Sequence, residues 1–375
     1  MKGPFAWSQA NGFVCTRGVE ERECLMRVWF DVLTPKQVLF FGPIVAEFRS
    51  MGADVLVTSR RYREVGPLAD RAGLEMTFVG ERGRKGREDQ LLAATRRQEE
   101  MVPLVKKFGP GVAVSTASAV CARVAYGLGI KHIAVNDSPH SEVAGRLSLP
   151  LSHRLLCPWV IPYGAWAPYG LRRDQVITYR ALDPAAWLKR PPVSGPVPKL
   201  DLSKDTVTVR FQESDAPYLA GADLGWSDKV LALLVDEFSG ANIVALCRYD
   251  YQVEEVKRRF GSRVIVPEEV VGGHDLLAVT SLFVGMGGTM SAEAALMGVP
   301  TISAFQGSLY TDRYLMKVGL LEKARTPSSV VSKARRLLSG STRARIARKA
   351  RQVLGSMEDP VPPVARQIET TAEQA

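Results

Sequence analysis

The 375-residue sequence has few cysteines and few histidines, and neither residue type forms a recognised pattern. The five cysteines are scattered and none lies in a Cys-x-x-Cys pair, while the four histidines lack the His-Glu-x-x-His spacing of a zinc site. The sequence therefore predicts neither a disulfide framework nor a metal centre. Scattered cysteines are typical of a reducing compartment, which predicts a cytoplasmic protein.

Long apolar runs are also lacking. Residues 1–25 carry several charged side chains between positions 17 and 23, and they contain no apolar core like that of a signal peptide. The most apolar stretch, 155–171, contains three prolines and predicts a strand end and a loop, not a membrane span. We predict that residues 1–25 form a disordered extension and that folded structure begins at Met26.

Short β-branched segments alternate with helical patterns along two stretches of the chain. This alternation predicts parallel sheets covered by helices on both faces. Five prolines interrupt it between the two stretches. We predict an α/β fold of two doubly wound Rossmann-like domains that face a cleft, with a strand at 263–266 among those of the second domain. The predicted divisions are 26–182, a proline-rich linker over 183–204, a second domain over 205–340, and a basic helix and tail over 341–375.

Positive charge is concentrated in the segment 322–352. It holds ten lysines or arginines and one acid, and so contributes nine of the ten net positive charges. Such a segment can bind anionic lipid, nucleic acid or phosphorylated ligands, or it can be the solvated face of a basic helix that crosses back to the first domain. Because no nucleic-acid-reading motif accompanies it, nucleic acid is not expected as a partner.

The stretch GMGGTMSAEAALMGVPTIS carries the strongest functional pattern. Gly287 and Gly288 lie between a predicted strand and a predicted helix, where they permit a turn and the close approach of a ligand. The N–H groups of Gly288, Thr289 and Met290 at the helix start suit a diphosphate. Glu293 can accept hydrogen bonds from two vicinal ribose hydroxyls. The alternative is an ordinary turn in which Glu293 complements the helix dipole.

The same stretch resembles the signature of the domain of unknown function 354 family, glycosyltransferase-B-like (GT-B) proteins found mainly in archaea. The stretches RVWFDVLTPKQVLFFGPIVAEFRSMGADVLVTSR and SAVCARVAYGLGIKHIAVNDSPHSEVAGRLSLPL agree with it. It is also similar to the nucleotide-sugar segment of UDP-N-acetylglucosamine 2-epimerase and of lipid-linked N-acetylglucosaminyltransferases. The resemblance implies that Gly287, Gly288 and Thr289 hold the diphosphate of a UDP-linked sugar in the second domain, that Glu293 holds its ribose, and that the first domain binds the acceptor.

The chain departs from the family pattern at several positions, among them Tyr179 to Ala181, which read YRA where the family has a YPG-like turn. Where the family commonly shows PxHVHFF, this chain has PKQVLFF, so that Gln37 and Leu39 stand at the two histidine positions. Ala292 stands where a basic residue often precedes the helix acid. These differences argue against a catalytic role for the first-turn positions, and they leave open a divergent acceptor or a loss of activity.

Catalytic candidates lie in VNDSPHSE, which follows a predicted strand of the first domain. Asp137 or His140 can act as the base that deprotonates an acceptor hydroxyl. The alternative is that Asp137 or Ser138 caps the helix that follows. Arg210, at the end of the first strand of the second domain, can pair with diphosphate oxygens, or it is a surface arginine.

Two further segments are candidates for substrate contacts. In FQGSLYTDRY, the residues Gln306, Tyr310 and Asp312 are predicted to touch the sugar. The aromatic side chains within 159–169 either engage a lipid-linked or membrane-bound acceptor or pack as an ordinary proline-rich loop. The first alternative would place this predicted cytoplasmic protein at the inner face of the membrane.

Together these patterns predict a metal-independent glycosyltransferase that moves a sugar from a nucleotide sugar to an acceptor and uses no cofactor. One alternative is a nucleotide-sugar epimerase or hydrolase of the UDP-N-acetylglucosamine 2-epimerase type, against which the loss of both first-turn histidines weighs. The other is a non-catalytic binder of a nucleotide sugar or of a polyanion.

Overall fold

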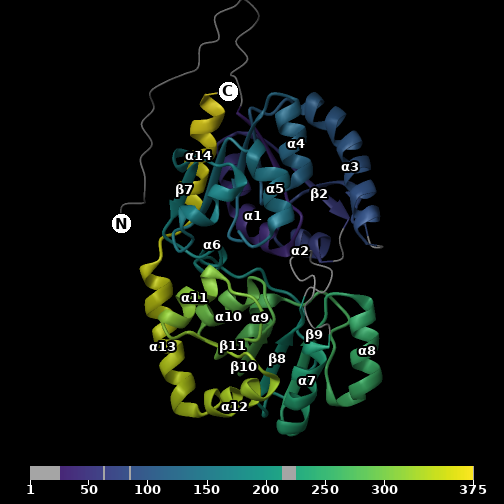
Figure 1. Ribbon diagram of the computed structural model, residues 1–375, viewed down its shortest axis with the longest axis vertical. Coiled ribbons are helices and arrows are strands. Elements are labelled where there is room, and N and C mark those ends of the chain that lie inside the picture. Colours follow the sequence, from purple (N-terminus) through teal and green to yellow (C-terminus); the bar gives the residue numbers. More distant parts are fainter. Residues whose placement is uncertain (1–25, 62–63, 84–85, 213–224, 375) are drawn as a thin grey trace, which may run out of the picture.

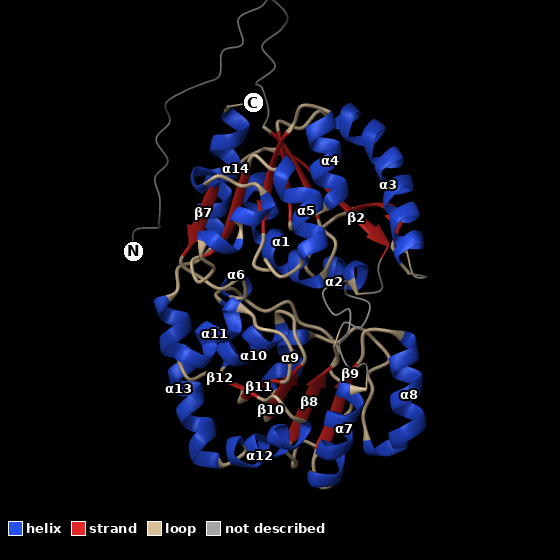
Figure 2. Ribbon diagram, in the orientation of Figure 1, coloured by secondary structure: helices blue, strands red, loops and turns tan. Residues whose placement is uncertain are grey.

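The computed structural model describes residues 26–61, 64–83, 86–212 and 225–374. The predicted extension over 1–25 lies outside these residues. Two α/β domains are stacked along the long axis of the molecule (Figure 1). Each has a parallel sheet with helices packed around it, as the alternating sequence pattern predicts (Figure 2).

The N-terminal domain is built on a seven-stranded parallel sheet, counted over its described residues, in the order β3-β2-β1-β4-β5-β6-β7. The strand order reverses at β1, whose neighbours are β2 and β4, and ligands bind at such points beyond the carboxyl ends of the strands. The strands are β1 (Arg27–Asp31), β2 (Asp54–Arg61), β3 (Thr77–Glu81), β4 (Val112–Ser115), β5 (Lys131–Val135), β6 (Arg154–Pro158) and β7 (Val176–Tyr179). The main helices are α1 (Pro35–Ser50), α2 (Val65–Arg71), α3 (Arg87–Phe108), α4 (Ala119–Gly127) and α5 (Glu142–Ser148).

The C-terminal domain has a smaller parallel sheet, with five strands in the described part of the chain, in the order β12-β11-β10-β8-β9. The strands are β8 (Thr206–Arg210), β9 (Asn242–Leu246), β10 (Leu282–Gly285), β11 (Thr301–Ser303) and β12 (Leu321–Lys323). The helices are α7 (Trp226–Glu237), α8 (Asp250–Phe260), α9 (Gly273–Ala278), α10 (Met290–Met297), α11 (Tyr310–Lys317) and α12 (Pro327–Leu337).

The strand predicted at 263–266 is wrong. This segment forms a 3-10 turn over Gly261–Arg263 and a single parallel bridge between Val244 and Ile265. Only Ile265 exchanges backbone hydrogen bonds with β9, through Ala245 and Ile243. The β-branched composition of the segment reflects partial burial beside the edge of the sheet, and such burial favours the same residues as a strand does.

The chain crosses between the domains at two places. At the first, α6 (Ala185–Leu188) and an extended segment lead from β7 to β8. At the second, α13 (Gly340–Ser356) ends on the C-terminal domain and α14 (Val361–Glu373) returns to the N-terminal domain, where it packs against α1 (Figure 1). Arg190 at the first crossing donates two hydrogen bonds, of 3.0 and 2.8 Å, to the carboxylate of Asp359 at the second. The two crossings are therefore joined.

The basic segment near the carboxyl end is part of the folded surface and is not one continuous helix. Ser339 has an extended backbone and separates α12 from α13, because serine competes with helical hydrogen bonding. Arg335 pairs with Glu237, Arg336 with Glu322, and Arg343 with Asp205, so intramolecular ion pairs take up part of the charge. Of the helices in the described residues, none combines the length and apolar character needed to span a bilayer.

A close helix contact explains one glycine of the signature. Gly298 ends α10 with a φ of +84°, and a Cβ atom there would lie 2.7 Å from the Cα atom of Ala347. Glycine is therefore needed both for the left-handed backbone and for the approach of α13 to α10.

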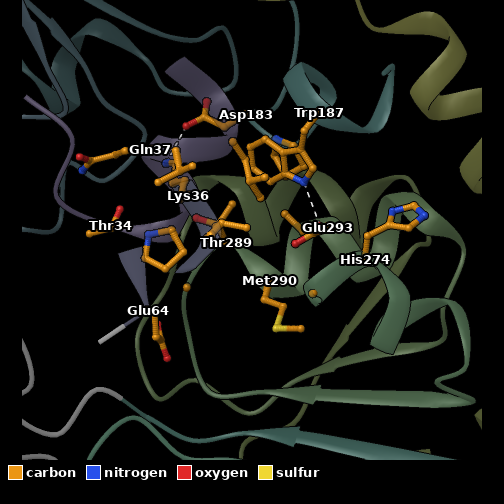
Figure 3. Close-up of a pocket in the computed structure, with 18 of the residues that line it drawn as sticks. Thr34, Lys36, Gln37, Glu64, Asp183, Trp187, His274, Thr289, Met290 and Glu293 are labelled. Carbon is orange, nitrogen blue, oxygen red and sulfur yellow. Dashed lines mark hydrogen bonds and ion pairs between the residues drawn. The ribbon is translucent and has the colours of Figure 1, made fainter. Parts of the chain in front are cut away.

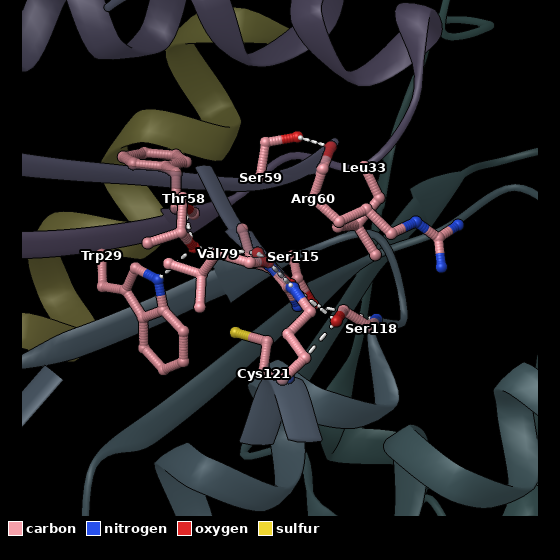
Figure 4. A network of polar contacts seen from close by, with 12 residues as sticks. Trp29, Leu33, Thr58, Ser59, Arg60, Val79, Ser115, Ser118 and Cys121 are labelled. Carbon is pink, nitrogen blue, oxygen red and sulfur yellow. Dashed lines mark hydrogen bonds and ion pairs between the residues drawn. The ribbon is translucent and has the colours of Figure 1, made fainter. Parts of the chain in front are cut away.

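A buried polar network joins the carboxyl ends of the central strands of the N-terminal domain (Figure 4). Asp31 lies in register with Thr58 of β2 and Ser115 of β4. Its carboxylate accepts hydrogen bonds from Thr58 Oγ1 at 2.8 Å, Ser118 Oγ at 2.7 Å, and Arg97 Nη2 at 2.6 Å. Burial raises the pKa of Asp31, but Arg97 and these hydroxyls outweigh burial and hold the pKa below its usual value. Asp31 therefore stays ionised inside the domain.

Replacing Arg97 by methionine removes the cation and leaves the Asp31 carboxylate buried without a counter-charge. We expect Arg97→Met to lower the stability of the protein by about 3–5 kcal/mol, the range for breaking a buried ion pair. Thermal unfolding followed by circular dichroism measures the effect. Arg96→Met, at the exposed neighbouring position of α3, is the matched control and should unfold close to wild type. Equal melting temperatures for Arg97→Met and wild type would contradict the argument.

Candidate functional site

A cavity of about 890 Å³ lies between the two domains. It is lined by the start of α1 and the β5–α5 loop of the N-terminal domain, by the first crossing, and by the ends of β8, β9 and β10 in the C-terminal domain. These are the carboxyl ends of parallel strands, where α/β folds bind ligands. Figure 3 shows side chains from both domains pointing into this space.

The glycine turn borders the cavity on the side of the C-terminal domain. Gly287 and Gly288 have φ values of +100° and +88°, a left-handed conformation that glycine adopts without strain. Thr289 is the N-cap residue of α10, and Gly288, Thr289, Met290 and Glu293 all line the cavity. The first N–H groups of a helix have no acceptor within the helix, so this turn directs backbone donors and the positive end of a helix dipole at a ligand.

Two arginines lie beside the glycine turn. Arg210 is in register with Gly285, at the start of the turn, and with Leu246 at the end of β9. A Cβ atom built on Gly288 would lie 3.1 Å from Nη2 of Arg248, so this guanidinium is in contact with the turn. Arg210 is not a surface residue, because its side chain is 13% exposed and forms an ion pair of 3.6 Å with Glu64 of the N-terminal domain.

Glu293 is buried in an otherwise apolar part of α10, with an exposed fraction of 6%. Its Oε1 atom accepts a 2.9 Å hydrogen bond from Nε1 of Trp187, which comes from α6 at the first crossing (Figure 3). Burial raises the pKa of Glu293 to about 7, although the indole hydrogen bond acts in the opposite direction. The carboxyl group therefore titrates near neutral pH.

A charged cluster lines the N-terminal side of the cavity. Nζ of Lys36, in the first turn of α1, lies 2.6 Å from Oδ1 of Asp137 and 2.6 Å from Oδ2 of Asp183. The Tyr179 hydroxyl donates a 2.5 Å hydrogen bond to the other oxygen of Asp183. Burial raises the pKa of Asp137, but Lys36 outweighs it and the pKa of Asp137 lies below its usual value. Burial raises the pKa of Asp183, and Lys36 only partly offsets this.

His140 lies in the same part of the cavity, on the loop before α5. Burial lowers the pKa of His140 and nearby Lys36 lowers it further, while Asp137 raises it. Its ring lies 6.3 Å from the ring of Phe305 in the C-terminal domain, measured between centroids. The predicted capping role of Asp137 or Ser138 is wrong, because the N-cap of α5 is Ser141.

Three of the residues that depart from the family pattern, Gln37, Leu39 and Ala292, line the cavity. The side chain of Gln37 contacts the backbone just before α1, where its Oε1 atom accepts a 2.5 Å hydrogen bond from the N–H of Leu33. Leu39 and Ala292 present apolar surface. The first-turn positions therefore contribute a structural hydrogen bond and an apolar wall.

The predicted sugar contacts are not among the residues that line the cavity. Asp312 is buried at 3% exposure, and its Oδ2 atom accepts a 2.6 Å hydrogen bond from Ser303. Tyr310 packs against the guanidinium of Arg313, 5.2 Å from the ring centroid, and Gln306 is exposed. Leu309 and Thr311 of the same segment line the cavity instead.

The aromatic loop after β6 is packed against the protein. Trp166 is fully buried, and the Tyr169 hydroxyl donates a hydrogen bond to the carbonyl of Pro139. Trp159 packs edge-on against Tyr314 of the other domain, with the ring centroids 5.0 Å apart. These side chains therefore pack as an ordinary proline-rich loop, which was the alternative to contact with a lipid-linked or membrane-bound acceptor.

The sequence patterns did not identify several side chains that line the site. Lys36, Glu64, Asp183, Trp187 and Arg248 each lie within a segment that reads as a helix start, a linker or a strand end. Asp183 and Trp187 fall in the predicted linker, where composition argues against a site. Lys36 is the exception, because it directly precedes Gln37, the first of the two family-pattern positions, at the start of the helix that follows β1. Within the described residues, no three or more His, Cys, Asp or Glu side chains are grouped to hold a metal ion.

The two facing domains define a protein of the GT-B fold. The family model described as a protein of unknown function, DUF354, matches residues 26–362, so the chain belongs to this family. This confirms the resemblance seen in the sequence. A protein of Methanocaldococcus jannaschii described as uncharacterised is 27% identical over 300 residues, which cover 77% of this chain and 85% of that protein.

Solved structures similar to this one include both epimerases and glycosyltransferases. The UDP-GlcNAc 2-epimerase of Neisseria meningitidis, bound to UDP-GlcNAc, has a TM-score of 0.69 at 12% identity, covering 93% of this chain and 100% of that chain. The spinosyn forosaminyltransferase has a TM-score of 0.62 at 18% identity with the same coverage. The UDP-GlcNAc 2-epimerase of Methanocaldococcus jannaschii has a TM-score of 0.61 at 14% identity, covering 86% and 99%. At these identities the likeness shows the fold, and the predicted fold is confirmed.

Replacing Lys36 by methionine leaves Asp137 and Asp183 buried together without their cation. In this variant burial raises the pKa values of both carboxyl groups above their values in the unfolded chain. The loss of stability is therefore complete at a pH above the raised pKa values. It becomes smaller as the pH falls and both groups become protonated. We expect Lys36→Met to lose about 3–5 kcal/mol of stability at pH 7 and less near pH 4. Thermal unfolding across this pH range measures the loss. Lys106→Met, at an exposed position of α3, is the control, and a loss independent of pH would contradict the assignment.

Proposed function

We propose that this protein is a glycosyltransferase that binds a nucleoside-diphosphate sugar, UDP-linked by the family resemblance, in the cavity between its domains. The observation that carries this proposal is the glycine turn at the start of α10, which opens into the cavity with Arg210 and Arg248 beside it and Glu293 one turn further on. This arrangement offers donors for a diphosphate and an acceptor for a ribose within one short segment.

The diphosphate is the leaving group, and its developing charge requires stabilisation. The N–H groups of Gly288, Thr289 and Met290, together with the two guanidinium groups, supply hydrogen bonds and positive charge for it. These groups neutralise the diphosphate without a metal ion or a cofactor in the proposed mechanism. Glu293 accepts hydrogen bonds from the vicinal hydroxyls of the ribose.

His140 is the favoured base on the acceptor side. Because its pKa is lowered, the imidazole is neutral at pH 7 and can take a proton, whereas Asp137 is held in an ion pair with Lys36. The acceptor oxygen forms a bond to the anomeric carbon, the bond from that carbon to the diphosphate breaks, and the hydroxyl proton moves to His140. The acceptor itself stays a prediction from the sequence, lipid-linked or at a membrane surface, as does the cytoplasmic location.

An epimerase or a hydrolase would use the same donor site, and the structurally similar epimerases keep this alternative in view. The products separate the three reactions. A nucleotide sugar incubated without an acceptor gives a second sugar nucleotide with an epimerase, and a free sugar with a hydrolase. A strict transferase leaves it unchanged until an acceptor is added.

Titration calorimetry with UDP-, GDP-, ADP- and dTDP-sugars tests the donor site directly. We expect saturable binding of one nucleotide series, weakened at least about tenfold, or about 1.4 kcal/mol, in Glu293→Gln. Because the carboxylate is the binding form, wild-type affinity should rise with pH through about 7, and Glu293→Gln should lose this dependence. Asp312→Asn, which alters a buried carboxyl outside the cavity, is the matched control. Failure of the wild type to bind any of these ligands would overturn the proposal.

Glu64 competes with the ligand for Arg210. Its carboxylate lies 3.6 Å from the guanidinium, where a phosphate oxygen would otherwise pair. We expect Glu64→Gln to bind the same nucleotide sugar about threefold more tightly, because less of the Arg210 interaction is lost on binding. Calorimetry at low and at moderate salt measures the change. Glu99→Gln, exposed on α3, controls for net charge, and an unchanged or weaker affinity of Glu64→Gln would contradict this role.

A further inference from the structure

The hydrogen bond between Trp187 and Glu293 joins the first domain crossing to the proposed ribose site. The two residues are 106 positions apart, both are buried, and both line the cavity. Within the described part of the chain, the side-chain hydrogen bond to the Glu293 carboxylate comes from the indole N–H of Trp187. The sequence patterns place Trp187 in a linker and assign it no role.

The indole acts on one oxygen of Glu293 and leaves the other available. A carboxylate oxygen has two acceptor positions, so Oε1 keeps one and Oε2 keeps both after the indole has bound. Two acceptors on one carboxylate suit two neighbouring hydroxyls of a sugar, and a single donor fixes the rotation of the carboxylate plane. Ala292 and Ala294, the neighbours of Glu293 along α10, are buried and have no side-chain donor.

We propose that Trp187 is a positioning residue that orients the Glu293 carboxylate toward the vicinal hydroxyls of a ribose, and that it makes the site selective for ribonucleotides over 2′-deoxyribonucleotides. This inference rests on the proposed function, since it concerns the donor that Glu293 binds. Trp187 acts through Glu293, which touches the ligand.

The charge state of Glu293 gives this role a signature that simple packing does not have. Burial raises the pKa of Glu293 to about 7 even though the indole hydrogen bond lowers it, so removal of the indole favours the protonated form at neutral pH. A protonated carboxyl has an O–H donor and less acceptor capacity for the ribose. Loss of the indole should therefore cost most affinity near pH 7 and less at alkaline pH.

Other charged groups near this position must be held constant in any pH comparison. Lys36, Arg190, Arg210 and His274 line the same cavity, and Asp275 of α9 and Asp312 of α11 lie on helices packed against α10. Trp187→Phe changes none of them and keeps an aromatic ring at the position. The difference between wild type and Trp187→Phe thus isolates the indole N–H.

The test is calorimetric titration of wild type and Trp187→Phe between pH 7 and 9. The probes are UDP, GDP, ADP and CDP, followed by the 2′-deoxy counterpart of whichever ribonucleotide the wild type binds best. We expect Trp187→Phe to bind the ribonucleotide about tenfold more weakly at pH 7, to recover most of the affinity by pH 9, and to lose selectivity for ribose over deoxyribose at pH 7. The double variant Trp187→Phe/Glu293→Gln should bind the ribonucleotide about as weakly as Glu293→Gln alone, because the indole acts through the carboxylate that Glu293→Gln removes.

Trp166→Phe provides the matched control. Trp166 is fully buried in the N-terminal domain, outside the cavity, and its variant should keep the wild-type affinity, pH profile and ribose selectivity. Wild-type behaviour of Trp187→Phe would overturn the inference, and so would an equal loss at every pH and for both nucleotides, which indicates general damage. If Glu293→Gln weakens binding while Trp187→Phe does not, only this inference fails. Absence of nucleotide binding by the wild type overturns the proposed function and this inference with it.

Discussion

Lys36 lies between two carboxylates at the N-terminal wall of the cavity, and the geometry of this wall depends on that pairing. Removing an ion from water costs several kcal/mol, so each buried charge must meet an opposite charge at close range. Lys36 comes from the start of α1, Asp137 from the end of β5 and Asp183 from the segment before α6. The need for charge pairing therefore brings three separate chain segments together beside His140.

The same requirement recurs around the cavity. Glu64 meets Arg210, and Arg190 meets Asp359 where the two crossings run together. Glu293 is different, because its recorded partner is a neutral indole and the charge remains expensive to bury. A group that is destabilised in the free protein and stabilised by ligand hydroxyls is well suited to a binding role. This contrast distinguishes Glu293 from the paired acids that hold the domains in shape.

The two domains contribute differently to the proposed chemistry. The C-terminal domain offers backbone donors and guanidinium groups in one short region, which suits a ligand with concentrated negative charge. The N-terminal domain offers a histidine beside a paired charge cluster and an apolar wall that includes Leu39. The crossing that carries Trp187 packs against α1 of the N-terminal domain and donates a hydrogen bond to Glu293 of the C-terminal domain, so it contacts both halves.

Local patterns in the sequence predicted the two-domain α/β fold, the glycine turn and the place of Glu293, because strand–helix alternation and glycine backbone preferences act over a few residues. The strand at 263–266 was predicted wrongly because partial burial beside a sheet edge selects the same side chains as a strand. The ion pairs of Lys36, the contact of Arg248 with Gly288, and the bond from Trp187 to Glu293 were decided by tertiary structure alone. Each joins residues that are far apart in the chain, and only the packing of helices and strands determines which distant side chains meet.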